Sequence, residues 1–356
     1  MKVLIVGLGG IGQRHVRNLR TLLGERADIL AYRVRRLSHV VTPTLQADSS
    51  RDVEKEYGVQ AFDSLDHALA GRPDVAFICN PTSLHVPAAL ACARSGCDLF
   101  LEKPISNDMS GIPDLVAAVE TGKRIAMVGY QLRFHPCLRR LREILTAGSL
   151  GRVLAVRATV GEYMPGWHAY EDYRQMYASR ADLGGGVIVS QIHEFDYLYS
   201  LFGLPRRLFA LGGHWSSLEI DVEDVASTLM ECHTAAGPLA VHLHQDYLQR
   251  PPSRHCEVIG DQGKVLADFA NLSVTVYDRN GNVADAQSFQ GLERNQLFMD
   301  ELKHFLSSVD RRQKPVVDLR DGLASLSMAL AARKSIASGR VVELDSNECS
   351  EYCEYV

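Results

Sequence analysis

The sequence lacks a long hydrophobic run. No stretch of about 18 consecutive apolar residues occurs in it, and a helix that crosses a bilayer needs about that many. The amino-terminal segment MKVLIVGLGG has one lysine before an apolar run, but the small-residue cleavage site of a signal peptide does not follow. We therefore expect a cytoplasmic protein that has no membrane partner.

An excess of positive charge is also missing. The 38 lysine and arginine residues are outnumbered by 43 aspartate and glutamate residues, which gives a formal net charge of −5. Binding to nucleic acid normally needs a basic field, and the short basic clusters at 33–36 and 139–142 are too small to create one. We expect no nucleic-acid partner.

Metal-ligand and disulfide spacings are absent as well. The eight cysteines are scattered and none forms a CxxC pair, so we interpret them as reduced thiols of a cytosolic protein. His242 and His244 alternate along a predicted strand, which favours a sheet or subunit interface over a metal pair. His193 opens HEFD rather than the zinc motif HExxH. The sequence predicts no metal site.

What the sequence does contain is the pattern of a two-domain α/β protein. Its 356 residues exceed what one core usually supports, and 46% hydrophobic with 23% charged residues is ordinary globular composition. Strand-like and helix-like segments alternate over residues 2–129, which predicts a doubly wound parallel sheet with helices on both faces, a Rossmann domain over 1–130. The expected strands are 3–6, 29–32, 75–79, 99–101 and 125–128, and the expected helices are 11–23, 50–57, 84–95 and 112–121.

The second half of the sequence has a different pattern. Strand-like runs between residues 206 and 288 are separated by turn signals such as Asn280-Gly281. We predict an α+β domain over 131–345 with a large, mostly antiparallel open sheet. The acidic residues 346–356 lack a period and are expected to be disordered. Helices are expected at 136–145, 292–309 and 319–338, and a glycine triplet opens a helical segment that ends near residue 203.

A glycine-rich motif follows the first predicted strand. Residues 7–12 read GLGGIG, a G-x-G-x-x-G at the mouth of a predicted helix. There the first glycine allows a tight turn, the second lets the backbone approach a pyrophosphate, and the third lets the helix pack on the strand. Glycines that serve packing alone are the alternative. We predict that a dinucleotide contacts Gly7, Gly9, Gly10, Ile11 and Gly12.

The second predicted strand is followed by arginine rather than by an acidic residue. A site for NAD usually has Asp or Glu about 20 residues after the glycines, and here Arg33 and Arg35 occupy that region. Guanidinium groups suit a 2′-phosphate. The sequence thus favours NADP as the cofactor and leaves NAD possible, because the two arginines could instead face solvent.

Three further motifs follow in order, namely NPTSLH at 80–85, EKP at 102–104 and GYQLRFHP at 129–136. With the glycine motif they give nearly the whole chain a resemblance to the glucose–fructose oxidoreductase / inositol dehydrogenase / rhizopine-catabolism (Gfo/Idh/MocA) family. The resemblance implies NAD(P)-dependent redox chemistry on sugars, cyclitols or related compounds. It also implies that the carboxy-terminal domain binds the substrate and forms a homodimer or homotetramer through its sheet.

The EKP motif places a lysine at the end of a predicted parallel strand. A solvated charge pair is the plain interpretation, but ligands of open α/β sheets lie outside the carboxyl ends of the strands. Lys103 can there donate a hydrogen bond to the oxygen of a reacting carbinol or carbonyl and stabilise developing negative charge. By the resemblance, Glu102 lies near the nicotinamide-side ribose, and Asn80, Pro81 and Lys103 border the cofactor.

The segment GGGVIVSQIH at 184–193 resembles a family helix that carries an aspartate and then a histidine. His193 matches the histidine, and its unperturbed pKa of about 6.5 suits general acid–base catalysis. Ser190 stands in the place of the aspartate, where it can orient His193 from the same helix face but cannot act as a carboxylate. We predict catalytic roles for Lys103, His193 and Ser190, with a structural histidine as the alternative for His193.

Aromatic and polar side chains gather in two segments that lead toward the expected cleft. Flat rings, hydroxyls and a guanidinium suit a polyhydroxylated ligand, including an anionic one. A well-packed seam between the domains is the alternative interpretation. The predicted substrate-binding residues are Tyr130, Arg133, Tyr163, Trp167, Tyr173 and His193.

The function we favour is that of an NAD(P)-dependent oxidoreductase. It would transfer a hydride between nicotinamide and a carbinol or carbonyl of a sugar, a sugar derivative or a nucleotide sugar. A regulator that binds NAD(P) and a sugar without turnover is a second hypothesis, favoured by Ser190 in place of the aspartate. A glycosidase that uses its cofactor for transient oxidation is a third.

Overall fold

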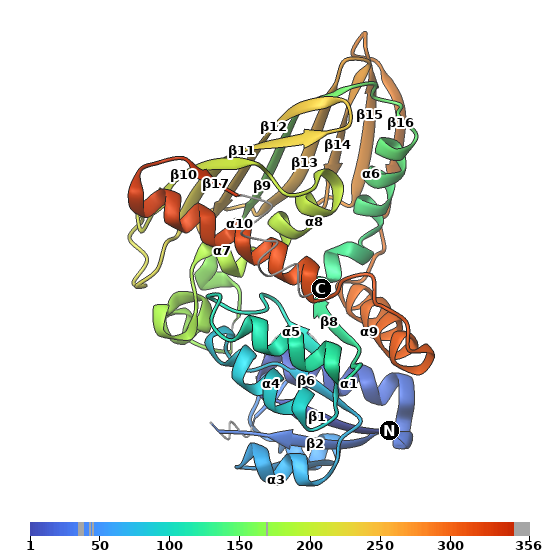
Figure 1. The fold of residues 1–356 in the computed structure, drawn as a ribbon, viewed down its shortest axis with the longest axis vertical. Coiled ribbons are helices and arrows are strands. Elements are labelled where there is room, and N and C mark those ends of the chain that lie inside the picture. Colours follow the sequence, from blue (N-terminus) through green and yellow to red (C-terminus); the bar gives the residue numbers. More distant parts are fainter. Residues whose placement is uncertain (35–38, 43, 45, 169, 345–356) are drawn as a thin grey trace.

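The computed structural model describes residues 1–34, 39–42, 44, 46–168 and 170–344. Arg35, a predicted cofactor residue, and the tail 346–356, predicted to be disordered, lie outside the described residues. Within these ranges no helix is both long and apolar enough to cross a membrane. Figure 1 shows two units, a smaller parallel sheet at one end of the molecule and a large open sheet at the other.

The amino-terminal unit is a six-stranded parallel sheet with the strand order β5-β2-β1-β6-β7-β8. This confirms the predicted doubly wound sheet, and its order reverses between β1 and β6, where such sheets bind ligands. The strands are β1 Lys2–Val6, β2 Asp28–Tyr32, β5 Val59–Phe62, β6 Val75–Ile78, β7 Asp98–Glu102 and β8 Ala126–Gly129. The helices are α1 Gly10–Leu23, α2 Val53–Tyr57, α3 Leu65–Ala70, α4 His85–Arg94 and α5 Ile112–Thr121, and β3 Val40–Val41 pairs with β4 Ala47–Asp48.

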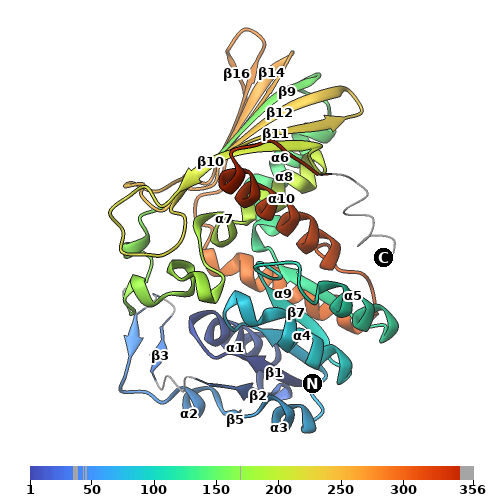
Figure 2. The ribbon, with the colours of Figure 1, turned by 60° about the vertical axis from the view of Figure 1, so that its left-hand side comes forward.

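Burial on both faces explains why these strands are continuous apolar runs. All four residues of β6 are buried, as are the last four of β1. Helices cover both faces of this sheet (Figure 2), so alternation of polar and apolar residues would place polar groups in the core.

The carboxy-terminal unit is a nine-stranded sheet with the order β16-β15-β14-β13-β9-β12-β11-β10-β17. It is mostly antiparallel, as predicted, but its neighbours β9 and β12 run parallel, which the long connection between them allows. The strands are β9 Val153–Gly161, β10 Arg207–Gly213, β11 Val225–Thr234, β12 Gly237–Asp246, β13 Ser253–Gly260, β14 Gly263–Asp268, β15 Ser273–Asp278, β16 Val283–Ser288 and β17 Val342–Glu343.

Helices lie against one face of this large sheet (Figure 1). The side chains of β11 and β12 accordingly alternate between buried and more exposed positions along most of each strand. The helices of this half are α6 Pro136–Thr146, α7 Val187–Ser190, α8 His193–Phe202, α9 Arg294–Arg311 and α10 Leu319–Ser338. The segment after the glycine triplet is therefore two helices with a break, not one.

Helix α9 belongs to the second half of the sequence but packs on the first unit. Its residue Phe305 is fully buried, and its ring meets those of Phe77 on β6 and Phe100 on β7 edge-on, with centroids 5.6 and 5.5 Å apart. Leu302 joins the same core cluster as the residues of β1. The core of the Rossmann unit thus includes a helix from beyond the predicted boundary at residue 130.

Candidate active site

The glycine motif forms a tight turn between β1 and α1. Gly7 has a φ of +95°, and a Cβ atom there would lie 2.8 Å from the backbone nitrogen of Asn80. A Cβ at Gly12 would lie 2.1 Å from the Gly7 carbonyl oxygen, whereas a Cβ at Gly9 would meet no atom within 4 Å. The first and third glycines are therefore required by the chain itself, and the second borders open space. Ile11 is half-buried in the first turn of α1.

Asn80 and Pro81 lie beside this turn, at the carboxyl end of β6. The Asn80 side chain donates a hydrogen bond to the Leu84 carbonyl at 3.0 Å. The ring nitrogens of His85 lie 2.8 Å from the Asn80 carbonyl oxygen and 2.7 Å from that of Pro104. His85 thus joins the loop after β6 to the EKP motif after β7.

Glu102 ends β7 with its carboxylate in the interior. Its Oε1 lies 2.6 Å from Nε2 of His15, which is fully buried in α1. Glu301 of α9 is buried nearby, and burial, followed by the charges of Glu102 and Asp196, raises its pKa well above the usual range of a glutamate. The motif glutamate is thus fixed between α1 and α9, at the edge where the strands end.

Lys103 crosses from the first unit to the second. Its Nζ donates a hydrogen bond to the Ser190 carbonyl oxygen at 2.6 Å. Ser190 ends α7, so the break between α7 and α8 leaves this carbonyl without an intrahelical partner. The backbone of Ser190 therefore holds the lysine, while the Ser190 side chain is buried beside the phenol of Tyr247.

His193 begins α8 directly after that break. It is buried, and its ring meets that of Tyr130 edge-on, with centroids 5.6 Å apart. Burial, and then the positive charges of Lys103, Arg254 and Arg294, hold its pKa well below 6.5. Its Nδ1 has no hydrogen-bond partner in the described part of the chain. The structure brings the predicted lysine and histidine into one electrostatic environment, with the histidine neutral at neutral pH.

Tyr170 of the second unit covers the start of α1. Its hydroxyl oxygen lies 2.5 Å from the position that a Cβ at Gly10 would occupy, and its ring stacks on that of His168 with centroids 5.0 Å apart. The segment between β9 and α7 therefore lies over the glycine motif (Figure 2). The second unit thus contacts the edge of the parallel sheet that carries the glycine motif.

Tyr130 and Arg133 lie in the interior rather than at a free surface. Tyr130 is fully buried against His193. Arg133 forms a two-pronged ion pair with Asp196, at 2.7 and 2.8 Å, and also reaches Asp321 at 3.1 Å. Its predicted contact with substrate is disfavoured, because two carboxylates already compensate its charge.

This buried ion cluster gives a stability prediction. Arg133→Met would leave Asp196 and Asp321 without their cation, and burial already raises the pKa of Asp196 to about 6. We expect the free energy of unfolding in urea to fall by about 3–5 kcal/mol. Arg139→Met, an exposed arginine on α6, should change it by less than about 0.5 kcal/mol. Equal stability of the two variants would contradict the assignment.

The predicted aromatic substrate residues each have protein partners. The Arg250 guanidinium lies 3.8 Å from the centroid of the Tyr163 ring, and Trp167 packs edge-on against Tyr247 at 5.1 Å. The Tyr173 hydroxyl accepts a hydrogen bond from the Glu219 amide at 3.3 Å. They belong to the segment that covers the glycine motif, and their contact with a ligand remains a prediction.

Arg33 directly follows β2 and forms an ion pair with Glu54 of α2. Only 6% of its side chain is exposed. The predicted guanidinium for a 2′-phosphate therefore already has a carboxylate partner, which the sequence alone did not show.

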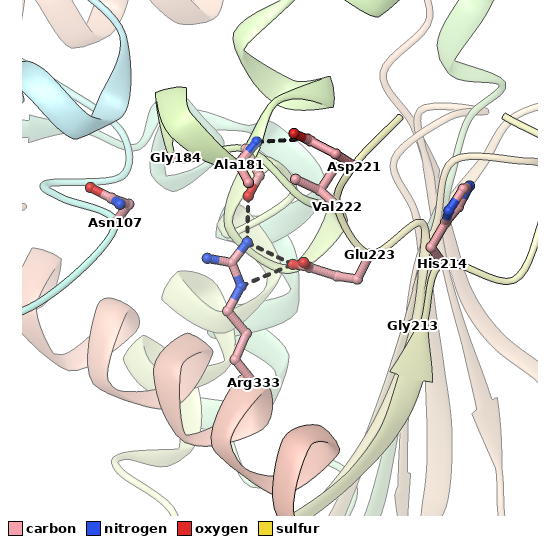
Figure 3. A pocket seen from close by; sticks show the side chains of 10 residues that line it. Asn107, Ala181, Gly184, Gly213, His214, Asp221, Val222, Glu223 and Arg333 are labelled. Carbon is pink, nitrogen blue, oxygen red and sulfur yellow. Dashed lines mark hydrogen bonds and ion pairs between the residues drawn. The ribbon is translucent and has the colours of Figure 1, made fainter. Parts of the chain in front are cut away.

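A cavity of about 370 Å³ is lined in part by Gly184 and Gly185 of the glycine triplet (Figure 3). Arg333 of α10 crosses it, with an ion pair to Glu223 at 2.8 Å and a hydrogen bond to the Gly185 carbonyl. Neither Lys103 nor His193 lines it. The charges of Arg333 and Glu223 in it compensate each other, so we place the candidate site at Lys103 and His193 instead. In the described ranges no group of three or more His, Cys, Asp or Glu side chains could hold a metal ion.

Sequence reasoning did not identify two cations that act on His193, Arg254 and Arg294, or a third, Arg14, that acts on Arg294's neighbourhood from α1. Arg254 pairs with Glu194 at 2.8 Å, next to the histidine, Arg294 begins α9, and Arg14 lies in α1. The glycine motif could have drawn attention to Arg14, two positions after its last glycine. No local pattern marks Arg254 or Arg294, because only the fold brings β13 and α9 to this place.

Comparison with protein families gives two matches along the chain. Residues 1–130 match the oxidoreductase family with an NAD-binding Rossmann fold, and residues 138–266 match the GFO/IDH/MocA C-terminal domain.

Known proteins of similar sequence and structure span almost the whole chain. The chain is 25% identical over 352 residues to myo-inositol 2-dehydrogenase of Thermotoga maritima, covering 97% of this chain and 99% of that protein. It is 24% identical over 356 residues to scyllo-inositol 2-dehydrogenase (NAD(+)) of Bacillus subtilis, covering 97% and 96%. The structure of the WlbA dehydrogenase from Bordetella pertussis, in complex with NADH and UDP-GlcNAcA, has a TM-score of 0.78 at 20% identity, covering 97% and 98%.

Proposed function

The chain belongs to the GFO/IDH/MocA oxidoreductase family, and we propose that it transfers a hydride between a nicotinamide cofactor and a carbinol or carbonyl of a sugar-like substrate. The observation that carries the proposal is the meeting of Lys103 and His193, which come from different units. The lysine donates to the carbonyl of Ser190, at the end of α7, and its charge, after burial, lowers the pKa of the histidine that begins α8.

The residues around the glycine motif fit a dinucleotide. The space beside Gly9 is open, and α1 begins without a side-chain cap, so its first N–H groups are available to a pyrophosphate. We propose that Gly7, Gly9, Gly10, Ile11 and Gly12 form the cradle. Asn80, Pro81, Glu102 and Lys103 would border the rest of the cofactor, which when bound supplies the hydride donor or acceptor.

In this proposal Lys103 donates a hydrogen bond to the reacting oxygen and His193 transfers the proton. An ammonium group has three donors, so Lys103 can keep the Ser190 carbonyl and still donate to the substrate oxygen, which stabilises negative charge there. Neutral His193 accepts the carbinol proton during oxidation and returns it during reduction. Ser190 acts through its backbone, because its buried hydroxyl cannot replace a carboxylate.

The glycines offer a matched pair of variants. Gly12→Ala places a Cβ 2.1 Å from the Gly7 carbonyl, so we expect a loss of about 1–3 kcal/mol in unfolding free energy together with loss of cofactor binding. Gly9→Ala meets no protein atom within 4 Å. It should therefore leave stability unchanged and weaken cofactor binding, because the methyl group enters the space of the pyrophosphate. Titration calorimetry measures cofactor affinity and urea unfolding measures stability. Unchanged cofactor affinity in Gly9→Ala would contradict the proposal that these glycines bind the pyrophosphate.

We also propose that the protein prefers NADP to NAD, which requires a change at Arg33. Arg33 must exchange its carboxylate partner Glu54 for the 2′-phosphate. Glu54→Gln should therefore tighten NADP binding and leave NAD binding unchanged. A lower dissociation constant for NAD than for NADP in the unmodified protein would overturn the preference.

The substrate class is proposed from the relatives and from the site. Two relatives are named as inositol dehydrogenases, and the WlbA dehydrogenase is seen in complex with NADH and UDP-GlcNAcA. We propose a polyhydroxylated compound, either a sugar, a cyclitol or a nucleotide sugar. The test follows nicotinamide absorbance while purified protein is incubated with either cofactor and a panel of these compounds. Tight cofactor binding without absorbance change on any compound would instead support a regulator.

Self-association and location complete the proposal. The open sheet has helices on one face (Figure 1), and exposed Leu211 on β10 and Leu229 on β11 give its other face apolar character. We propose a homodimer or homotetramer through that face, to be measured by light scattering.

The six described cysteines are free thiols, which supports a reducing, cytoplasmic location.

A further inference from the structure

Two arginines beside the candidate site have no carboxylate partner. Arg14 of α1 and Arg294 of α9 form neither an ion pair nor a side-chain hydrogen bond with any described residue. Lys103 likewise forms no ion pair there and donates only to a carbonyl. Most other arginines near the interface are paired, as Arg133 is with Asp196 and Arg254 is with Glu194.

Contacts between α1 and α9 place the two guanidinium groups close together. The Arg14 guanidinium carbon lies 4.4 Å from the centroid of the Phe298 ring, and Phe298 is one helical turn after Arg294 on the same face of α9. One turn beyond Arg14, the side chain of Asn18 accepts a hydrogen bond from that of Asn295 at 3.0 Å. The face of α1 that begins at Gly10 is thus directed at the first turn of α9.

The pKa values of Arg14 and Arg294 agree with two positive charges that lie close together. The pKa of Arg14 is lowered to about 10 by burial and then by the charge of Arg294. Arg294 is exposed to solvent at the start of α9, yet nearby protein atoms lower its pKa; after burial and the charges of Lys103 and Arg254, its charge also lowers the pKa of His193. The acidic groups that act on the pair are Glu102, which is bonded to His15, and Glu162, which raises the pKa of Arg294 without forming an ion pair.

A neutral substrate would leave the positive charges of Arg14 and Arg294 without a counter-charge. A substrate that covers two guanidinium groups removes water from them, which is costly unless hydrogen-bonded negative charge replaces it. Guanidinium groups are suited to carboxylate and phosphate oxygens because their donors match the spacing of those oxygens.

We propose that Arg14 and Arg294 form an anion subsite for the substrate, which therefore carries a carboxylate or phosphate group beside the carbon that exchanges hydride. This inference rests on the proposed function for the position of that carbon, next to Lys103 and His193. It narrows the substrate from sugar-like compounds in general to acidic ones.

The cofactor is the other source of an anion near α1. Its pyrophosphate is expected at Gly9 and Gly10, whereas Arg14 lies one helical turn further along α1, about 6 Å by helix geometry. Arg294 begins α9, which packs on the first unit but comes from the second half of the chain, and its charge acts on His193 of the second unit. The pair is therefore placed on the substrate side, and separate measurements of cofactor and sugar binding distinguish the two sources.

The test compares acidic and neutral probes on the cofactor-loaded protein by titration calorimetry. D-glucuronate and D-glucose differ only at C6, where a carboxylate replaces the hydroxymethyl group, and D-glucose 6-phosphate supplies the phosphate. We expect the unmodified protein to bind at least one acid about tenfold or more tightly than glucose. Arg14→Gln and Arg294→Gln should each remove most of this difference and leave glucose binding and cofactor affinity unchanged.

Two further variants sharpen the result. Arg311→Gln removes an exposed arginine from the other end of α9 and should keep the preference. Glu162→Gln removes the nearby negative charge and should strengthen acid binding by about two- to threefold. Acids that bind no more tightly than glucose to the unmodified protein overturn the subsite. Variants that lose cofactor affinity instead would assign the pair to the pyrophosphate, which also overturns it.

Failure of the subsite and failure of the proposed function give different results. A protein that oxidises neutral sugars and binds acids no better retains its function and loses the subsite. A protein that binds glucuronate through these arginines but exchanges hydride with no compound retains the subsite and loses the function.

Discussion

Lys103→Met should lower kcat by about a thousandfold or more, because it removes the hydrogen-bond donor that stabilises negative charge on the reacting oxygen. Methionine is close to lysine in length and apolar character, so the packing of the stem is retained. The Nζ atom that reaches the Ser190 carbonyl is lost. Steady-state rates with the compound identified from the panel, measured in both directions, give the size of the effect.

Cofactor binding separates this loss of catalysis from a loss of structure. Dissociation constants in Lys103→Met should stay within a few-fold of the unmodified protein, since the glycine cradle is untouched. Lys303→Met, an exposed lysine on α9, should retain full activity. A Lys103→Met enzyme with more than about a tenth of the normal kcat would remove the lysine from the reaction, because a donor at the reacting oxygen contributes far more than tenfold.

His193→Asn should lower kcat by about a hundredfold to ten-thousandfold, the range of a general acid–base group. Asparagine is smaller but keeps a polar group near the position of Nδ1, and it cannot accept a proton. His67→Asn, at an exposed position on α3, serves as the matched control and should change nothing. Similar activity of the two variants would leave His193 with a structural role only.

The pH dependence follows from the environment of His193. Burial, Lys103, Arg254 and Arg294 all disfavour the imidazolium form, so its pKa lies well below 6.5. The rate of substrate oxidation should therefore be independent of this group at neutral pH and fall only as acid titrates it. In Lys103→Met one repelling charge is gone, so the pKa of His193 should rise, which an NMR titration measures directly. An unchanged pKa would show that the two groups are not coupled.

The same shift predicts a loss of stability in acid. The unfolded chain binds a proton at His193 with a pKa of about 6.5, above that of the folded protein. The contribution to folding is thus fully present above about pH 6.5 and is lost as the pH falls toward the folded pKa. The difference in unfolding free energy between the protein and His193→Asn should shrink over that interval. A difference that stays constant there would contradict the shift.

The sequence alone determined the architecture of the first unit and the position of its ligand edge. Apolar runs such as 3–6 and 75–78 require burial on both faces, and the spacing of Gly7, Gly9 and Gly12 allows one turn between strand and helix. These are consequences of short-range geometry, because the steric limits of a turn and the period of a strand involve neighbouring residues. For the same reason the carboxyl end of β7, and Lys103 just after it, could be placed from the sequence.

Only the tertiary structure decided which charges are already paired and which are free. Arg33 and Arg133 look like ligand-binding arginines in the sequence, but Glu54 compensates the first, and Asp196 and Asp321 compensate the second. Arg14 and Arg294, which no motif singles out as a pair, remain without an acid among the described residues. Pairing depends on distances between side chains far apart in the chain, as between Arg133 and Asp321. Arg294 comes near Arg14 only because α9, which the sequence assigned to the second unit, packs on the first.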